Sequence, residues 1–143
     1  MKDELVEDIL NTIRHNGNRI TKVRRALIKI FCDCTSPKTA LELQALLKKA
    51  RLVVNKTTVY RELEFLLTQN IIGEIDLIDG MKRYELKIGQ GHHHHLVCTT
   101  CNTIKCVEME HDLDKLERRI ERKHGFIVTS HVLEFFGQCQ DCQ

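Results

Sequence analysis

The sequence has no tryptophan, two tyrosines, five phenylalanines and a single proline among its 143 residues. With so few aromatic rings, a hydrophobic core has to be built mainly from aliphatic side chains. No apolar run approaches the roughly 20 residues of a membrane-spanning helix, and no charged-then-apolar leader precedes the first polar residues. We therefore expect a cytoplasmic protein without a membrane partner. A hydrophobic content of 42% excludes a disordered polar chain.

Charge is unevenly distributed, although the formal net charge is only +2. Residues 14–61 carry twelve Lys or Arg against two acidic residues, whereas residues 82–143 carry nine of each sign. A solvated charged face is the simpler explanation of such an excess. Its confinement to one half of the chain favours a polyanionic partner for that half.

Four of the seven cysteines form two Cys-x-x-Cys pairs, separated by 37 residues. Two such pairs brought together complete a closed tetrahedral sulfur shell for Zn²⁺, which is typical of a structural rather than a catalytic site. Disulfides or a redox pair are the alternatives, and the expected reducing compartment argues against them. The predicted structural zinc ligands are Cys98, Cys101, Cys139 and Cys142.

Four consecutive histidines lead into the first cysteine pair. If this run is a strand, His93 and His95 project from one face and His92 and His94 from the other. Two separate His-x-His half-sites for metal follow from that alternation. A solvated polar run is the alternative interpretation.

The basic half predicts helices. Apolar residues recur at three- and four-residue intervals over residues 3–15, and again after each of Thr21, Thr39 and Asn55, which can cap helix N-termini. The basic residues near the start of the second helix are expected to lie outside its core face. The fourth helix, residues 56–67, has an outward face of Lys, Thr, Tyr and Arg, which can contact phosphates and reach base edges.

Two β-rich runs follow, residues 71–79 and 82–88, joined at Asp79-Gly80, a hairpin signal. Helices followed by such a wing indicate a winged helix-turn-helix domain. The second half predicts a strand from the histidines, a second strand ending near Cys106, a helix from Asp112 to Gly125 and a long strand over residues 126–136. The predicted fold class is α+β, with the winged-helix domain at residues 1–88, a hinge at 89–91 and a small α/β domain at 92–143.

Together these motifs resemble the ferric uptake regulator family over essentially the whole chain. The resemblance is carried by Arg19-Ile20-Thr21 with Arg24-Arg25, Thr39-Ala40-x-Glu42-Leu43, Thr57-Thr58-Val59-Tyr60-Arg61-x-Leu63, Arg83-Tyr84-Glu85, the run from His92 to Cys101, His124-Gly125-Phe126, His131 and the last cysteine pair. It implies a homodimeric, metal-responsive transcriptional repressor of iron or zinc uptake genes. It also implies that residues 92–143 form the dimerisation domain and carry the structural zinc.

The resemblance further implies two metal sites beside the structural zinc. A regulatory site for Fe²⁺ or Zn²⁺, with Mn²⁺ possible, would use Glu85, His93 and His95. An additional site would use His92, His94, Asp114 and His131. Two positions depart from the family pattern: Pro37 replaces a customary histidine, and Cys106 stands where an acidic ligand is common. Either Cys106 is a regulatory ligand, or Glu108 or Glu110 replaces it.

For DNA, we expect Tyr60 and Arg61 to contact bases of a pseudo-palindromic operator. The predicted phosphate contacts and neighbouring helix residues are Arg19, Lys22, Arg25, Lys56, Thr57 and Thr58. No His-Glu-x-x-His helix or nucleophile–base pair stands out, so neither an enzyme nor a small-molecule substrate is expected. A peroxide-sensing repressor of the same family and a zinc-stabilised interaction module without DNA binding are the alternatives.

Overall fold

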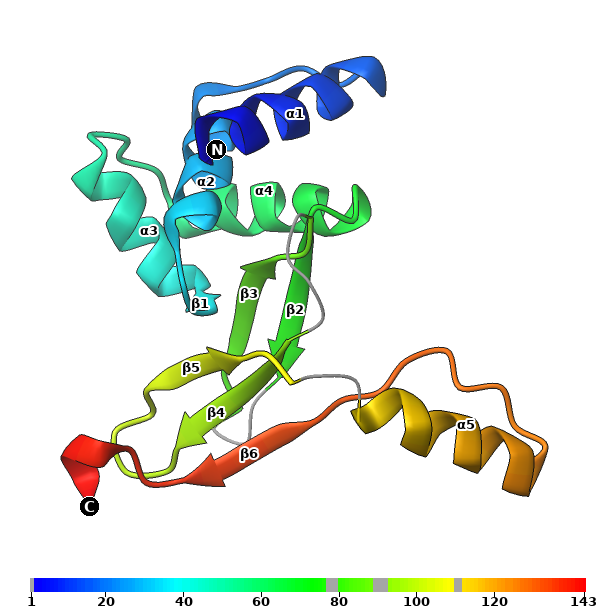
Figure 1. The fold of residues 1–143 in the computed structure, drawn as a ribbon. Coiled ribbons are helices and arrows are strands. Elements are labelled where there is room, and N and C mark those ends of the chain that lie inside the picture. Colours follow the sequence, from blue (N-terminus) through cyan, green and yellow to red (C-terminus); the bar gives the residue numbers. More distant parts are fainter. Residues whose placement is uncertain (1, 77–79, 89–92, 110–111) are drawn as a thin grey trace. The chain divides into compact units, whose positions relative to one another are not determined.

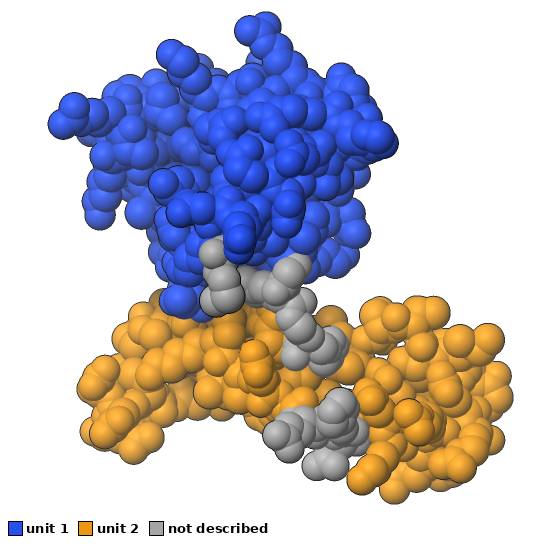
Figure 2. Space-filling model, turned by 45° about the horizontal axis from the view of Figure 1, so that its top comes forward, with its two compact units in different colours: residues 1–90 blue, residues 91–143 orange. Residues whose placement is uncertain are grey.

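The computed structural model describes residues 2–76, 80–88, 93–109 and 112–143, which form two compact units, residues 1–90 and 91–143 (Figure 1 and Figure 2). The predicted hinge, residues 89–91, lies outside the described residues. Helices and sheets are both present, so the α+β fold class is confirmed. In the part of the chain that the structure describes, every helix is too short or too polar to cross a bilayer.

The described residues of the first unit include four helices, which begin where the sequence predicts. Thr21 accepts a hydrogen bond from the backbone N–H of Arg24 at 3.1 Å, and Asn55 accepts one from that of Thr58 at 2.8 Å. Thr39 and Glu42 form a reciprocal capping box. These caps satisfy backbone N–H groups that the first helical turn leaves without partners. The helices are α1 (Lys2–His15), α2 (Lys22–Asp33), α3 (Ala40–Lys49) and α4 (Lys56–Thr68).

As far as the chain is described, the wing is a three-stranded antiparallel sheet rather than a hairpin. Its strands are β1 (Lys38–Thr39), β2 (Ile72–Asp76) and β3 (Lys82–Leu86), in the order β1-β3-β2. Strand β1 was not predicted, because two residues are too short to show alternation. Residues 77–79 lie outside the described residues, and with them part of the predicted Asp79-Gly80 turn.

The core of the first unit is aliphatic, as expected from the few aromatic residues. Leu10, Ile13 and Leu27 have no exposed surface, and only two aromatic side chains, Phe31 and Tyr84, belong to the buried cluster. The cluster joins all four helices to β3 and thereby holds α4 at the surface of the unit.

One basic residue of α2 is not on the outside, contrary to the prediction. The Arg24 guanidinium lies 2.8 Å from the Glu62 carboxylate of α4 and 3.4 Å above the Phe65 ring. The Arg24 and Glu62 side chains are only 12% and 10% exposed. Helical periodicity placed Arg24 outside the core face, because the pattern of one helix could not show that a carboxylate of another helix meets it. This buried ion pair ties α2 to α4.

In the second unit, the residues that the structure describes form a three-stranded sheet and one long helix. The strands follow the order β5-β4-β6, with β4 antiparallel to β5 and parallel to β6 (Figure 1). The elements are β4 (His94–Cys98), β5 (Ile104–Val107), α5 (Asp112–His124), β6 (Glu134–Gly137) and a 3₁₀ turn η1 (Gln140–Cys142).

The long strand predicted over residues 126–136 is wrong for most of its length. Only β6, which begins at Glu134, is a strand. A strand needs a hydrogen-bonded neighbour, and β4 supplies partners only from His95, which pairs with Glu134. Three of the five apolar side chains before β6 are instead exposed: Phe126 by 65%, Ile127 by 81% and Val132 by 87%.

Candidate metal centres and nucleic-acid surface

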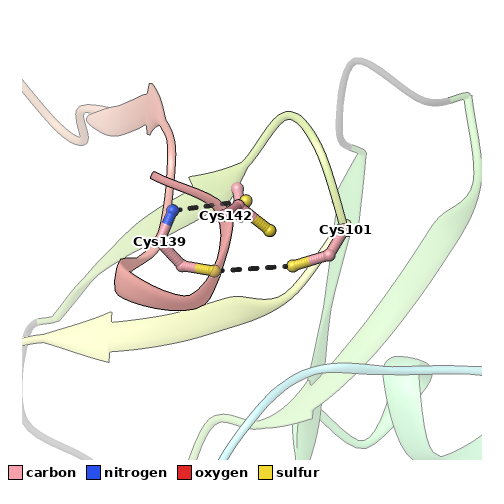
Figure 3. A group of neighbouring side chains, drawn as sticks. Cys101, Cys139 and Cys142 are labelled. Atoms are coloured by element: carbon pink, nitrogen blue, oxygen red, sulfur yellow. Dashed lines mark hydrogen bonds between the residues drawn. The ribbon is translucent and has the colours of Figure 1, made fainter.

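The two cysteine pairs meet at one end of the second unit's sheet. Cys98 ends β4, and the parallel pairing places it opposite Gly137, two residues before Cys139. The four sulfur atoms of Cys98, Cys101, Cys139 and Cys142 all lie within 4.8 Å of one another. The sulfurs of Cys101 and Cys139 are 3.6 Å apart (Figure 3). The pairing of β4 with β6 therefore assembles these four residues, which we call the four-cysteine cluster.

The four-cysteine cluster fits a structural zinc site. Zn–S bonds of about 2.3 Å in a tetrahedron separate the sulfurs by about 3.8 Å, close to the observed sulfur–sulfur distance. A disulfide would need about 2.05 Å, and all seven cysteines are free thiols. The residues present thus match the ion that the sequence predicts.

Electrostatics in the four-cysteine cluster also favour a cation. Hydrogen bonds from the backbone N–H groups of Cys101 and Cys139 lower the pKa of Cys98 to about 6. The side chain of Cys139 is the main cause that raises the pKa of Cys142 to about 12. Neighbouring thiols cannot all ionise while their charges remain uncompensated. A divalent cation removes this conflict and lets all four act as thiolates.

A second group of possible metal ligands lies on one face of the sheet formed by β4 and β5. The rings of His93 and His95 meet edge to face with centroids 5.2 Å apart. Cys106 stands opposite His95 in the β4–β5 register, and the donor atoms of the three residues lie within 4.8 Å of one another. We call these three residues the histidine–cysteine cluster. Glu85, the fourth predicted ligand, lies in β3 of the first unit, and its participation remains a prediction.

The sequence left Cys106 and two glutamates as alternatives at this cluster. The sheet places the Cys106 sulfur beside the histidines. The β4–β5 ladder ends at the pair His94–Val107, so Glu108 is not held in it, and Glu110 lies outside the described residues.

The opposite face of β4 borders a separate pocket of about 590 Å³. His94 is buried there and stacks on His131, with ring centroids 5.3 Å apart. Asp114 also lines the pocket, whereas His92, the other predicted ligand, lies outside the described residues. The predicted alternation of the histidine strand therefore holds for its described residues.

Glu117 is the residue of this pocket that the sequence analysis missed. Its carboxylate lies 2.5 Å from Nδ1 of His131. It follows Asp114 by three residues on α5, a spacing that puts both carboxylates on one side of the helix. That spacing was the available signal, but only the fold shows which side of α5 faces His131.

The predicted DNA-contacting residues lie on the surface of the first unit. Lys56 and Tyr60 are exposed at the start of α4, with the Lys56 ammonium 5.6 Å from the centre of the Tyr60 ring. Arg25 is exposed but bound to Glu7 of α1 at 2.7 Å. Of the remaining predicted contacts, Thr58 is half-buried and the others are exposed, namely Arg19, Lys22, Thr57 and Arg61.

A sequence profile of the ferric uptake regulator family matches residues 15–136. The chain belongs to this family. The ferric uptake regulation protein of Campylobacter jejuni is 32% identical over 98% of this chain and 89% of its own length. The peroxide-responsive repressor PerR of Staphylococcus saprophyticus is 30% identical over 96% of this chain and 91% of its own length. The fold is similar to the structure of the Helicobacter pylori ferric uptake regulator, with a TM-score of 0.83 and 21% sequence identity. The matched region covers 99% of this chain and 93% of that chain.

Ferric uptake regulator family proteins are metal-responsive transcription regulators, which confirms the predicted class of function. They bind DNA and function as dimers. The family fold also agrees with the mixed helix and sheet architecture described above.

Proposed function

We propose that this protein is a cytoplasmic, homodimeric repressor that binds a pseudo-palindromic operator when its regulatory metal is bound. The supporting observation is the histidine–cysteine cluster, a group of possible metal ligands separate from the four-cysteine cluster; strand β4 carries His95 of the first and Cys98 of the second. Glu85 would join His93, His95 and Cys106 as a ligand. A metal bound there would supply a link between β3 of the first unit and the sheet of the second, and so set the spacing of the two α4 helices on DNA.

The pocket on the other face of β4 would hold a further ion. His94, Asp114 and His131 line this pocket, and His92 is the fourth predicted ligand. Glu117 is an additional candidate because it already contacts the His131 ring. Carboxylate and imidazole together suit Zn²⁺, Fe²⁺ or Mn²⁺.

Exposed apolar residues of the second unit support the homodimer. Phe135 and Phe136 of β6 are 42% and 41% exposed, and Leu96, which pairs with Phe135, is 40% exposed. The segment before β6 adds Ile127 and Val132 to the exposed apolar surface. Surface of this kind marks association sites, and a second copy of the chain would cover it.

His93→Ala tests the regulatory role. For wild-type protein, bound metal should raise DNA affinity by about 5- to 150-fold, a typical coupling between two sites. In the variant, metal should no longer raise DNA affinity, because the histidine–cysteine cluster has one nitrogen ligand fewer. Fluorescence anisotropy would follow binding to duplexes selected from a random pool by the metal-loaded protein, with and without Zn²⁺, Fe²⁺ or Mn²⁺.

The matched control is His124→Ala, which removes an exposed histidine from the end of α5. Metal should raise the DNA affinity of this variant as much as that of the wild type. If metal raised the DNA affinity of His93→Ala as much as that of the wild type, the proposed regulatory site would be wrong. A metal-independent wild type that releases the selected DNA on peroxide treatment would favour the alternative of peroxide sensing.

Lys56→Ala and Arg61→Ala separate phosphate contacts from base contacts. Lys56→Ala should weaken binding to selected and random duplexes alike, and reduce the dependence of log K on log salt by about 0.9 for each phosphate that is no longer neutralised. Arg61→Ala should cost about 1–3 kcal/mol on the selected duplex and little on random DNA. Lys115→Ala, an exposed change on α5, serves as the control. Equal reductions in affinity for both duplexes in Arg61→Ala would rule out its base contact.

A further inference from the structure

Cys106 is positioned by the sheet rather than by a loop. It pairs with His95 across the antiparallel β4–β5 ladder, and the neighbouring pairs Leu96–Lys105 and His94–Val107 continue that register on both sides. Directly opposed residues of such a ladder point to the same face, with their Cβ atoms about 4.5–5.5 Å apart. The thiol therefore shares a face with His93 and His95, and its distance from them depends on backbone pairing.

The donor set of the histidine–cysteine cluster is two imidazoles and one thiol. Thiolate is a soft ligand, and it favours Zn²⁺ over the harder Fe²⁺ and Mn²⁺, which take carboxylate oxygen more readily. Zn²⁺ also binds most protein ligands more tightly than Fe²⁺ or Mn²⁺ does, which favours zinc at this cluster as well. Three protein ligands also leave one position of a zinc tetrahedron for a further group.

We propose that Cys106 makes the histidine–cysteine cluster selective for Zn²⁺ over Fe²⁺ and Mn²⁺, so that the corepressor is zinc. This inference rests on the proposed function, because it names the metal of the same regulatory site. Zinc would then occupy two separate sites: the four-cysteine cluster, with four sulfur ligands, and the histidine–cysteine cluster, where a single sulfur selects it.

Cobalt spectroscopy tests whether the Cys106 sulfur is a ligand. The full-length protein is first shown by elemental analysis to retain one zinc per chain, so that the four-cysteine cluster is filled. Co²⁺ is then added under reducing, oxygen-free conditions. We expect a thiolate-to-cobalt charge-transfer band in the near ultraviolet that saturates once the histidine–cysteine cluster is filled. The band should be absent in Cys106→Ser and present in Cys34→Ser, which changes a half-buried thiol of the first unit.

Competition then measures selectivity. Zn²⁺ should displace Co²⁺ far more effectively than Fe²⁺ or Mn²⁺ does. Cys106→Asp replaces sulfur by oxygen and should shift the ratio of zinc to iron affinities toward iron by about tenfold or more. Because Cys106 is exposed in the strand, both variants should fold, which far-ultraviolet circular dichroism checks.

DNA anisotropy on the same samples separates the two claims. If metals raise DNA affinity but no Cys106-dependent band appears and Cys106→Asp keeps the wild-type selectivity, the zinc inference is overturned and the proposed function stands. If the band appears but no metal changes DNA affinity, the proposed function fails and zinc is not a corepressor. Zinc-selective binding together with zinc-dependent DNA binding, both weakened in Cys106→Ser, is the expected result.

Discussion

Cys139→Ser is expected to release the structural zinc and unfold residues 91–143. The second unit has almost no core of its own: among the described residues, every buried apolar side chain belongs to the first unit except Cys98. A unit with so little buried apolar surface needs another source of stability. Structural zinc supplies about 10–16 kcal/mol of apparent binding free energy in small zinc domains, and this energy is available only to the folded form.

Limited proteolysis with mass spectrometry would measure the effect. In Cys139→Ser, cleavage should begin throughout residues 91–143, while the first unit stays resistant because its aliphatic core is intact. Elemental analysis should show the loss of one zinc per chain. Cys34→Ser should behave as wild type in both measurements. A second unit that kept its protease resistance without zinc would show that the four-cysteine cluster is not what stabilises it.

Arg24→Ala is expected to lower the free energy of unfolding of the first unit by about 3–5 kcal/mol. The change removes the cation that lies over the Phe65 ring and leaves the buried Glu62 carboxylate without its partner. The cost comes mainly from this isolated charge, not from the missing attraction. Denaturant titration followed by circular dichroism at helix wavelengths would measure the change.

Arg25→Ala is the matched control, because Arg25 lies on the same helix and also pairs with a glutamate. Its partner Glu7 is 52% exposed and Arg25 itself 47%, so water screens the pair and the expected loss of stability is about 0–1 kcal/mol. Arg24→Met combined with Glu62→Leu should recover most of the stability that Arg24→Ala removes, since no unpaired charge remains. Equal destabilisation at Arg24 and Arg25 would show that burial of the Arg24 pair has no energetic consequence.

The features that the sequence predicts well are those encoded within a few residues. Thr21, Thr39 and Asn55 cap helices because each side chain reaches an N–H group only three residues ahead. The spacing within each Cys-x-x-Cys pair is likewise visible in the sequence, and it predicts a metal site wherever the fold brings the two pairs together. The alternation of the histidines follows from strand geometry alone.

The features that were missed depend on a partner far away in the chain. Nothing near Arg24 in sequence reveals Glu62, which lies 38 residues later. Glu117 becomes notable only when His131, 14 residues on, packs against it. The strand predicted over residues 126–136 failed for the same reason, because its length is limited by the partner positions that β4 offers.

The run of identical histidines leaves the alignment of β4 ambiguous. If the strand slid by one residue, His92 and His94 would replace His93 and His95, and the metal-binding face would still present two imidazoles. The cysteine that ends the strand removes this ambiguity, because the same slide would carry Cys98 out of reach of the other three sulfurs. An ion bound by the four-cysteine cluster would therefore fix the register of β4, and with it which pair of histidines faces Cys106.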